Sequence, residues 1–574
     1  MANNKTKKNI KGKTTKVEKE IVVEKKEKIF DFKELIPALV LSFVTCFMLL
    51  IFEPTIMYAA NMNDFWFDYG MLMKTMFIYF LVAFLGLSFL FGIVYFINKK
   101  FFKEKKIFKI FYIASLIIFI ATYIQGNYLV GDLPVLTGDE IEWGNYLVND
   151  IITVVIWIVL IVSSVILCKK YKIEEVIKTS VYVVGAIFLM LLTSMLPSLF
   201  TENMFASKIV ADVTSVNLNT ASTDKNFFIL MLDTIDSQDF QELLKNDEFK
   251  GMLNDFTYYP DTMSAYPYTR DSVPSILSGE LDLNEKAFMD YYKEALDNSE
   301  LFKMLKEKGY DINTFEEEFI MQTKVAEDIT NIKKSSGGKK MYWLAKQETK
   351  YIAFRYLPYF LKKYTHIESA NLSSNYFDLY DDNLYHWNAR IYYRQLTTKE
   401  MTKTDQKMFK FTHIEGAHSP YDLDEDFNVI EDGNYSLKIV TAAKTIREYL
   451  KRLKDSGVYD NSAIIILADH GFNKEDEHSP YGRQNPILFI KGVNEHHDMY
   501  TSDKQISFLD LMNAYKDLLD DKKSTELFKD KTNKETRKYI WYKYSEENHM
   551  VEYETKGKAW ETEKLYKTGK EYNR

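Results

Sequence analysis

Long apolar runs dominate the first 200 residues, and short polar connections separate them. The runs cover residues 35–52, 75–97, 110–124, 151–168 and 179–200, of which 110–124 is the shortest. Any one of them alone could be a buried helix of a soluble core. However, a bilayer crossing needs about 20 mostly apolar residues, and five such runs in succession carry almost no charge. The pattern therefore predicts a transmembrane domain of five helices over residues 29–200.

The pattern changes after residue 225, where short apolar segments alternate with helix-like ones. Strands are predicted at 227–233, 256–259, 408–415, 462–471 and 486–492, and helices at 300–308, 341–363 and 436–456. Such alternation is typical of a mostly parallel, doubly wound α/β sheet, here over residues 226–525. The polar residues 201–225 are expected to be a linker.

Two aromatic segments leave more than one interpretation open. Residues 341–363 have an amphipathic helical pattern, which suits either packing in a core or contact with a lipid surface. Residues 537–560 are rich in Tyr, Trp and Lys and partly alternate, which predicts a small antiparallel sheet in a strand-rich extension at 526–574. That sheet would either pack against the α/β domain or offer an aromatic surface to a glycan.

The distribution of lysines predicts how the chain is oriented. Residues 1–28 contain ten lysines and four glutamates, and the connections 98–109 and 169–178 are also basic, whereas 53–74 and 125–150 are acidic. Basic segments stay in the cytoplasm, so the tail 1–28 is expected inside and everything after Phe200 outside. No small-residue cleavage site follows the first apolar run, which is therefore expected to be an uncleaved anchor.

The composition disfavours several classes of binding site for this chain. The chain of 574 residues has a net charge of −8, which does not favour binding to nucleic acid. Its two cysteines, Cys46 and Cys168, lie inside apolar runs, so neither a disulfide nor a zinc–thiolate site is expected. All nine histidines lie beyond residue 365, outside the predicted membrane helices.

Polar residues gather where the predicted strands end. Asp233 ends the first strand, Asp469 and His470 end the strand at 462–471, and His413 and His418 lie at or just beyond the strand at 408–415. Asp233 could also cap a helix, and Asp469–Gly471 could be a polar turn. A carboxylate and an imidazole at a buried strand end need compensation for lost solvation, which a divalent cation supplies. The donor types suit Mn²⁺ or Zn²⁺.

The stretch AYPYTRDSVPSILSGE at 265–280 places polar groups at the start of a helix. Asp271 or Ser272 could cap that helix. Alternatively, Thr269 is a nucleophile beside an anion held at the helix start. Arg270 would then clamp a phosphate, or else pair with Asp271 at the surface.

The order of these pieces resembles the sulfatase-like branch of the alkaline phosphatase superfamily: a strand with a terminal Asp, a hydroxyl before PSILSG, then GAH, ADHG at 468–471 and NPILFIKG. The chain is most similar to membrane-anchored phosphoglycerol and phosphoethanolamine transferases, which include lipoteichoic acid synthases. The resemblance implies five transmembrane helices followed by an extracellular sulfatase-like α/β domain, to which the pattern of residues 537–560 adds a small C-terminal antiparallel sheet.

The resemblance also implies roles for individual residues. Thr269 stands ten positions before Gly279, where the family has its nucleophile, and Asp233, Thr269, Asp469 and His470 match the metal ligands. His418 and His478 match catalytic and substrate-binding histidines, and Arg270 and His413 complete the candidate substrate-binding set. Two departures matter: Thr234 follows Asp233 where many sulfatases have a second Asp, and Ile276 stands where formylglycine formation requires Arg. A formylglycine sulfatase is therefore not expected.

The expected function is transfer of a phospho-alcohol group from a membrane phospholipid to a cell-envelope glycan or teichoic-type polymer. The expected cofactor is one divalent metal ion, with Mn²⁺ favoured over Zn²⁺, and the reaction would pass through a phospho-threonine. The protein is expected in the plasma membrane as a multi-pass protein. A hydrolase that uses water as the acceptor is the alternative. A non-catalytic lipid-binding protein is disfavoured, because all four candidate ligands are present.

Overall fold

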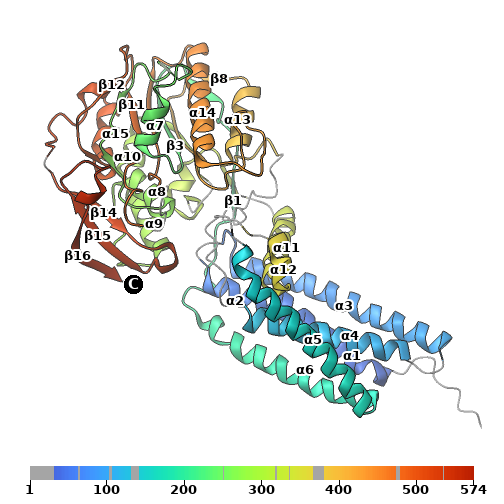
Figure 1. Cartoon of the computed structure of the whole chain (residues 1–574). Coiled ribbons are helices and arrows are strands. Elements are labelled where there is room, and N and C mark those ends of the chain that lie inside the picture. Colours follow the sequence, from blue (N-terminus) through green and yellow to red (C-terminus); the bar gives the residue numbers. More distant parts are fainter. Residues whose placement is uncertain are drawn as a thin grey trace, which may run out of the picture.

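A bundle of long helices and an α/β domain make up the computed structural model, and helices α11 (Gly337–Tyr356) and α12 (Tyr359–Lys362) lie at the end of the bundle nearest that domain (Figure 1). The structure describes residues 32–62, 65–102, 106–130, 141, 143–249, 251–316, 320–334, 337–365, 367, 381–473, 479–533 and 535–573, except for the side chains of 337–339 and 545. The basic tail 1–28 and His478 lie outside the described residues.

Five helices among the described residues are long and apolar enough to cross a membrane, which confirms the five predicted runs. The first crossing joins α1 (Phe32–Phe47), a π-helical turn (Met48–Phe52) and α2 (Glu53–Ala60). The others contain α3 (Tyr69–Phe101), α4 (Lys106–Tyr128), α5 (Leu147–Lys170) and α6 (Ile173–Met195). Along α5 only Thr153 is buried, so its apolar surface is left for lipid chains to cover.

The described part of the α/β domain has a seven-stranded sheet with the order β12-β4-β11-β10-β3-β9-β6. Its strands β10, β3, β9 and β6 run parallel, whereas β11 is antiparallel to both neighbours. The sheet is thus mostly parallel, as predicted, and β6 and β12 are strands that the sequence pattern did not indicate. The bounds are β3 (Asn226–Leu232), β4 (Thr257–Tyr258), β6 (Asp311–Phe315), β9 (Met408–Ile414), β10 (Ser462–Leu467), β11 (Leu488–Lys491) and β12 (Tyr500–Thr501).

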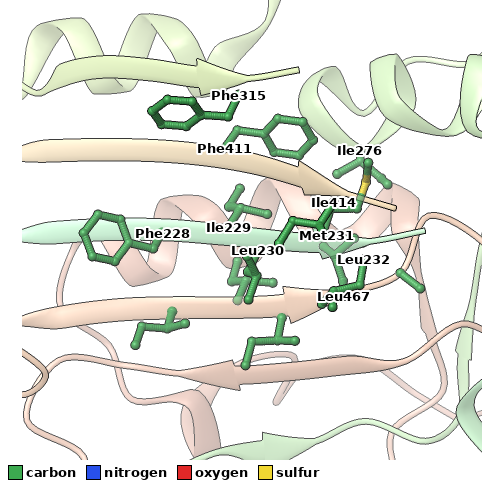
Figure 2. Close-up of a cluster of buried hydrophobic side chains, with 14 of the residues drawn as sticks. Phe228, Ile229, Leu230, Met231, Leu232, Ile276, Phe315, Phe411, Ile414 and Leu467 are labelled. Atoms are coloured by element: carbon green, nitrogen blue, oxygen red, sulfur yellow. The ribbon is translucent and has the colours of Figure 1, made fainter. Parts of the chain in front are cut away.

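Helices cover both faces of this sheet, because successive side chains of a strand point to opposite faces. The ring of Phe227 packs 5.9 Å from Tyr515, whereas that of the next residue, Phe228, packs 6.4 Å from Tyr449. Every residue of β3 is buried, and Figure 2 shows its apolar side chains among those of neighbouring strands. The helices are α7 (Ser237–Leu243), α8 (Thr269–Ser278), α9 (Phe288–Asn298), α10 (Glu300–Glu307), α13 (Ala389–Thr398), α14 (Tyr435–Asp455) and α15 (Leu511–Leu519).

Short strands tie the predicted linker to the α/β domain, so residues 201–225 are not a linker throughout. Within them, β1 (Ala211–Val213) pairs with β7 (Ile332–Lys334), and β2 (Thr220–Ser222) pairs with β8 (Thr402–Thr404). Another short pair is β5 (Thr262–Met263) with β13 (Ile506–Ser507). Distant strand partners of this kind leave no local hydrophobic pattern, which is why the polar composition was misleading.

The C-terminal extension contains the predicted antiparallel sheet, formed by β14 (Arg537–Trp541), β15 (His549–Thr555) and β16 (Tyr566–Asn573). It packs against the α/β domain through Arg537, which is buried and pairs with Asp261 at 2.8 Å, and through Ile540, whose N–H donates to the Ala265 carbonyl at 2.8 Å. These contacts place the extension against the stretch 265–280, which contains Thr269.

Candidate active site

Three neighbouring parallel strands, β3, β9 and β10, end at the same edge of the sheet and bring the predicted polar residues together. Asp233 directly follows β3, and Asp469 and His470 come just after β10. Their ligand atoms all lie within 4.8 Å of one another. Thr269, the first residue of α8, donates its hydroxyl to Asp233 Oδ2 at 3.3 Å. All four predicted metal ligands therefore meet in one cluster.

The backbone around Asp233 is tightly constrained. The next residue, Thr234, has a φ of +58°, a left-handed conformation that is uncommon without glycine. Its N–H donates to Asp469 Oδ1 at 3.1 Å and its hydroxyl to Asp233 Oδ1 at 2.5 Å. On the other side, a side chain at Gly416 would begin 2.4 Å from the Asp233 carbonyl oxygen, so the loop after β9 can approach only as glycine.

The cluster fits a divalent cation. Asp469 is fully buried, and its Oδ2 accepts no hydrogen bond from the described residues. Burial and the nearby charge of Asp233 raise the pKa of Asp469 to about 7, because two carboxylates repel each other in a dry site. Burial and the charge of Arg483 lower the pKa of His470 to about 3, so its imidazole is neutral, as a metal ligand must be. Two carboxylates, an imidazole and a hydroxyl suit Mn²⁺ or Zn²⁺.

The start of α8 is positioned by the C-terminal sheet rather than by a cap. The N-cap residue, Tyr268, makes no side-chain cap bond, and Asp271 is buried and accepts a hydrogen bond from Tyr542. Ser272 donates to the Tyr266 carbonyl at 3.4 Å. Neither Asp271 nor Ser272 thus acts as the N-cap that one interpretation of the sequence proposed.

Arg270 has a partner that the sequence did not suggest. Its guanidinium forms an ion pair with Glu547 and packs over the Phe288 ring at 4.1 Å. The alternative of a pairing with Asp271 at the surface is wrong, because Asp271 is fully buried. The predicted role of Arg270 as a phosphate clamp stays a prediction.

His413 lies beside Asp233 with both ring nitrogens engaged. Nδ1 is 2.7 Å from Glu316 Oε2, and the Trp387 indole N–H donates to Nε2 at 3.1 Å. Nε2 is also 3.7 Å from Asp233 Oδ2. These contacts fix the orientation of the His413 ring, and its predicted contact with substrate remains a prediction. The sequence pattern missed Glu316 and Trp387, although Glu316 directly follows a strand.

His418 is half-buried on the same side of the cluster. Its ring packs 5.5 Å from that of Trp387, and its Nδ1 donates to the Ser419 carbonyl. This bond occupies Nδ1 and fixes the orientation of the ring. The structure thus places His418 near the cluster, whereas the predicted role of His478 cannot be placed because it is not described.

A second arginine, absent from the predicted set, faces the cluster. Arg483 is 9% exposed, its Nη2 lies 3.2 Å from His470 Nε2, and its guanidinium packs 4.8 Å from the centre of the Tyr268 ring. The signal for it was its position in the segment SPYGRQNP, five residues before β11. Arg483 is therefore a second candidate to bind an anionic group at this site.

A cavity of about 280 Å³ is lined in part by Phe472 and Asn473, which closely follow His470 in the chain. Its lining combines aromatic, amide and carboxylate side chains: Phe472, Trp560, Gln238, Gln484 and Asp239. Such a mixture suits a polar ligand with apolar ring faces.

The family model for sulfatases matches residues 225–521, more than half of the chain. The chain therefore belongs to the sulfatase family of the alkaline phosphatase superfamily. None of the curated proteins matches it in sequence.

Similar solved structures include the lipoteichoic acid synthase LtaP from Listeria monocytogenes (14% identity, TM-score 0.34, covering 59% of this chain and 83% of that one). A second is the phosphonate monoester hydrolase SpPMH from Silicibacter pomeroyi (11% identity, TM-score 0.35, covering 58% and 85%). A third is a protein of the alkaline phosphatase superfamily from Vibrio parahaemolyticus (12% identity, TM-score 0.35, covering 63% and 80%).

Proposed function

We propose that this protein transfers a phospho-alcohol group, phosphoglycerol or phosphoethanolamine, from a membrane phospholipid to a cell-envelope glycan or teichoic-type polymer. The observation that carries the proposal is the Thr269 hydroxyl, which lies 3.3 Å from Asp233 within the cluster of candidate metal ligands. Five apolar helices on the same chain support a lipid donor. A bound divalent cation, Mn²⁺ in the first place, would lower the pKa of the Thr269 hydroxyl and stabilise charge on the transferring group.

In the first step, Thr269 Oγ, its proton lost to solvent, attacks the phosphorus of the lipid phosphodiester. The bond from phosphorus to the diacylglycerol oxygen breaks, and that oxygen takes a proton from His418 or His478. Arg483 and Arg270 are the candidate donors to the phosphate oxygens. The phospho-alcohol remains bonded to Thr269.

In the second step, an acceptor hydroxyl gives its proton to the same histidine and its oxygen attacks phosphorus, which releases Thr269. The cavity lined by Phe472 and Trp560 is a candidate place for a sugar ring of the acceptor. The rival is hydrolysis, in which water takes the place of the acceptor while the first step stays the same. A sulfatase mechanism is disfavoured because Thr269 cannot form formylglycine.

The test uses the purified full-length chain with single phospholipids that differ in head group. After incubation, intact mass spectrometry should find one adduct, whose mass identifies the head group, on the wild-type chain and none on Thr269→Ala. Adding a glycan acceptor should remove the adduct and extend the glycan. If the phospho-alcohol is instead released at the same rate with and without acceptor, the protein is a hydrolase. If no phospholipid is turned over, the proposed function is wrong.

The proposal also requires the α/β domain to lie outside the plasma membrane. Five apolar helices with basic connections on one side support an N-terminus in the cytoplasm and residues 201–574 outside. A reporter that is active only outside the cytoplasm should therefore be active when fused after Thr223. The same reporter fused after Phe102, in a basic connection, should be inactive. Activity in the reverse pattern would contradict the topology.

A further inference from the structure

Helix α11 belongs to the α/β half by sequence but to the membrane half by packing. Its buried side chains Leu344, Tyr351, Ile352, Phe354 and Tyr356 form one apolar cluster with residues of α1, α3, α4 and α6. They are not part of the core that surrounds the seven-stranded sheet. Figure 1 shows α11 and α12 against the end of the helical bundle. Of the two interpretations of residues 341–363, packing in a core is therefore the one that the structure supports.

The C-terminal end of α11 is bonded to two membrane helices. Arg355 donates from Nε to the Gly126 carbonyl on α4 at 2.8 Å, and its Nη1 pairs with Glu53 Oε1 on α2 at 3.1 Å. The neighbouring Tyr356 donates its hydroxyl to Glu53 Oε2 at 3.2 Å. The Glu53 side chain is fully buried, and a buried carboxylate is tolerated only with such partners.

The fit at this end is close. A side chain at Gly126 would begin 2.2 Å from the Tyr356 ring, so the helices could not pack as they do with any larger residue. Gly126 therefore permits the approach that brings Tyr356 and Arg355 to Glu53.

The middle of α11 is bonded to the segment between α2 and α3. The Trp66 indole N–H donates to Gln347 Oε1 at 3.1 Å, and Gln347 donates in turn to the Tyr351 hydroxyl at 2.8 Å. Lys340 lies 5.4 Å from the Trp66 ring and pairs with Asp212 on β1, in the α/β half. Attachment at two places about two turns apart fixes the direction of α11 as well as its position.

We infer that α11, over residues 340–356, is a strut that holds the candidate active site at a fixed height and orientation over the bilayer, so that Thr269 can reach a phosphodiester still embedded in lipid. Arg355, Glu53, Tyr356 and Gly126 are positioning residues for the lipid donor and take no part in the chemistry. This inference rests on the proposed function and adds to it the requirement that the donor is attacked in the membrane. A donor that diffuses freely in water needs no such alignment.

The experiment measures two substrates on the same full-length protein in phospholipid vesicles that contain phosphatidylglycerol and phosphatidylethanolamine. One substrate is the vesicle lipid, and the other is a water-soluble nitrophenyl phosphodiester. Arg355→Ala should lower turnover of the lipid by about 100-fold, because small misplacements of a reacting group cost that much. It should leave turnover of the soluble ester within about twofold. Gly126→Leu should have the same effect without removing a polar group.

Controls separate the possible failures. Arg394→Ala removes an exposed arginine that pairs with Asp382 at 3.0 Å and should change neither rate. If Arg355→Ala does not fold because Glu53 is left unpaired, the double variant Arg355→Met with Glu53→Gln removes the pair without a buried charge. Equal loss of both activities, or loss of neither, would contradict the inference that α11 aligns the site with the membrane. If the wild type turns over the ester but not lipid, the proposed lipid donor fails instead.

Discussion

Thr269→Ala should abolish turnover of the lipid donor, with a fall in rate of about 10⁴-fold or more, while the protein remains folded. The reason is that Thr269 supplies the only atom to which the phospho-alcohol is proposed to bond. Its hydroxyl donates a long hydrogen bond of 3.3 Å to Asp233, and the N-cap of α8 is Tyr268, so stability should change little. If Thr269 were only a helix cap, stability would fall by roughly 1 kcal/mol and the chemistry would survive.

Two further variants sharpen this prediction. Thr269→Ser keeps a hydroxyl at the same place and should retain part of the turnover, and the intact mass of the chain should still show the adduct. Ser272→Ala removes a hydroxyl from the same helix, one turn away and fully buried, and should be far milder. Rates and thermal melts of the three variants decide between the roles. Near-normal turnover by Thr269→Ala would eliminate the covalent mechanism.

Asp469→Ala and His470→Ala should each abolish bound metal together with activity. Loss of a residue that only supports a metal ligand weakens binding by about 10- to 100-fold, so loss of a ligand itself should exceed 100-fold. Metal content of the purified variants measures this directly. Because the cation binds the folded state alone, adding Mn²⁺ should raise the melting temperature of the wild type but not of either variant.

The metal-free protein supplies an independent check. Asp233 and Asp469 repel each other in a buried site, so Asp469→Asn, which removes the charge but keeps an oxygen to accept from the Thr234 N–H, should not destabilise the protein in the presence of a chelator and is expected to stabilise it. Asp460→Ala, which removes a carboxylate that is 60% exposed, is the matched control and should leave metal content and activity unchanged. Full metal occupancy in Asp469→Ala or His470→Ala would contradict the proposed ligand set.

Several features of the site were predictable because they depend on residues close together in the chain. A strand that is buried on both faces reads as a continuous apolar run, so the ends of β3 and β10 located Asp233, Asp469 and His470. Parallel neighbours end at the same edge, which places these residues together before any coordinates are known. The likeness of PSILSG to a family motif then singled out Thr269 among several hydroxyls.

Other features depend on residues far apart in the chain and left no local pattern. Arg270 pairs with Glu547, and His413 with Glu316. The sequence suggested a phosphate or Asp271 as the partner of Arg270 and gave no sign of either glutamate. Arg483 lies at the site because the turn before β11 brings it next to His470. The antiparallel direction of β11 could not be predicted from its apolar run either. Partners of this kind are chosen by the whole fold, and propensity alone does not reveal them.

The sequence by itself determined that five segments are long and apolar enough to cross a membrane, that an α/β domain follows, and which residue types could hold a metal. These properties follow from apolar length and periodicity, which solvent enforces on each segment separately. Only the tertiary structure decided that α11 packs with the membrane helices, through an Arg355–Glu53 pair whose residues are 302 positions apart. A contact over that distance is formed when two complementary surfaces fold against each other, and neither segment encodes it alone.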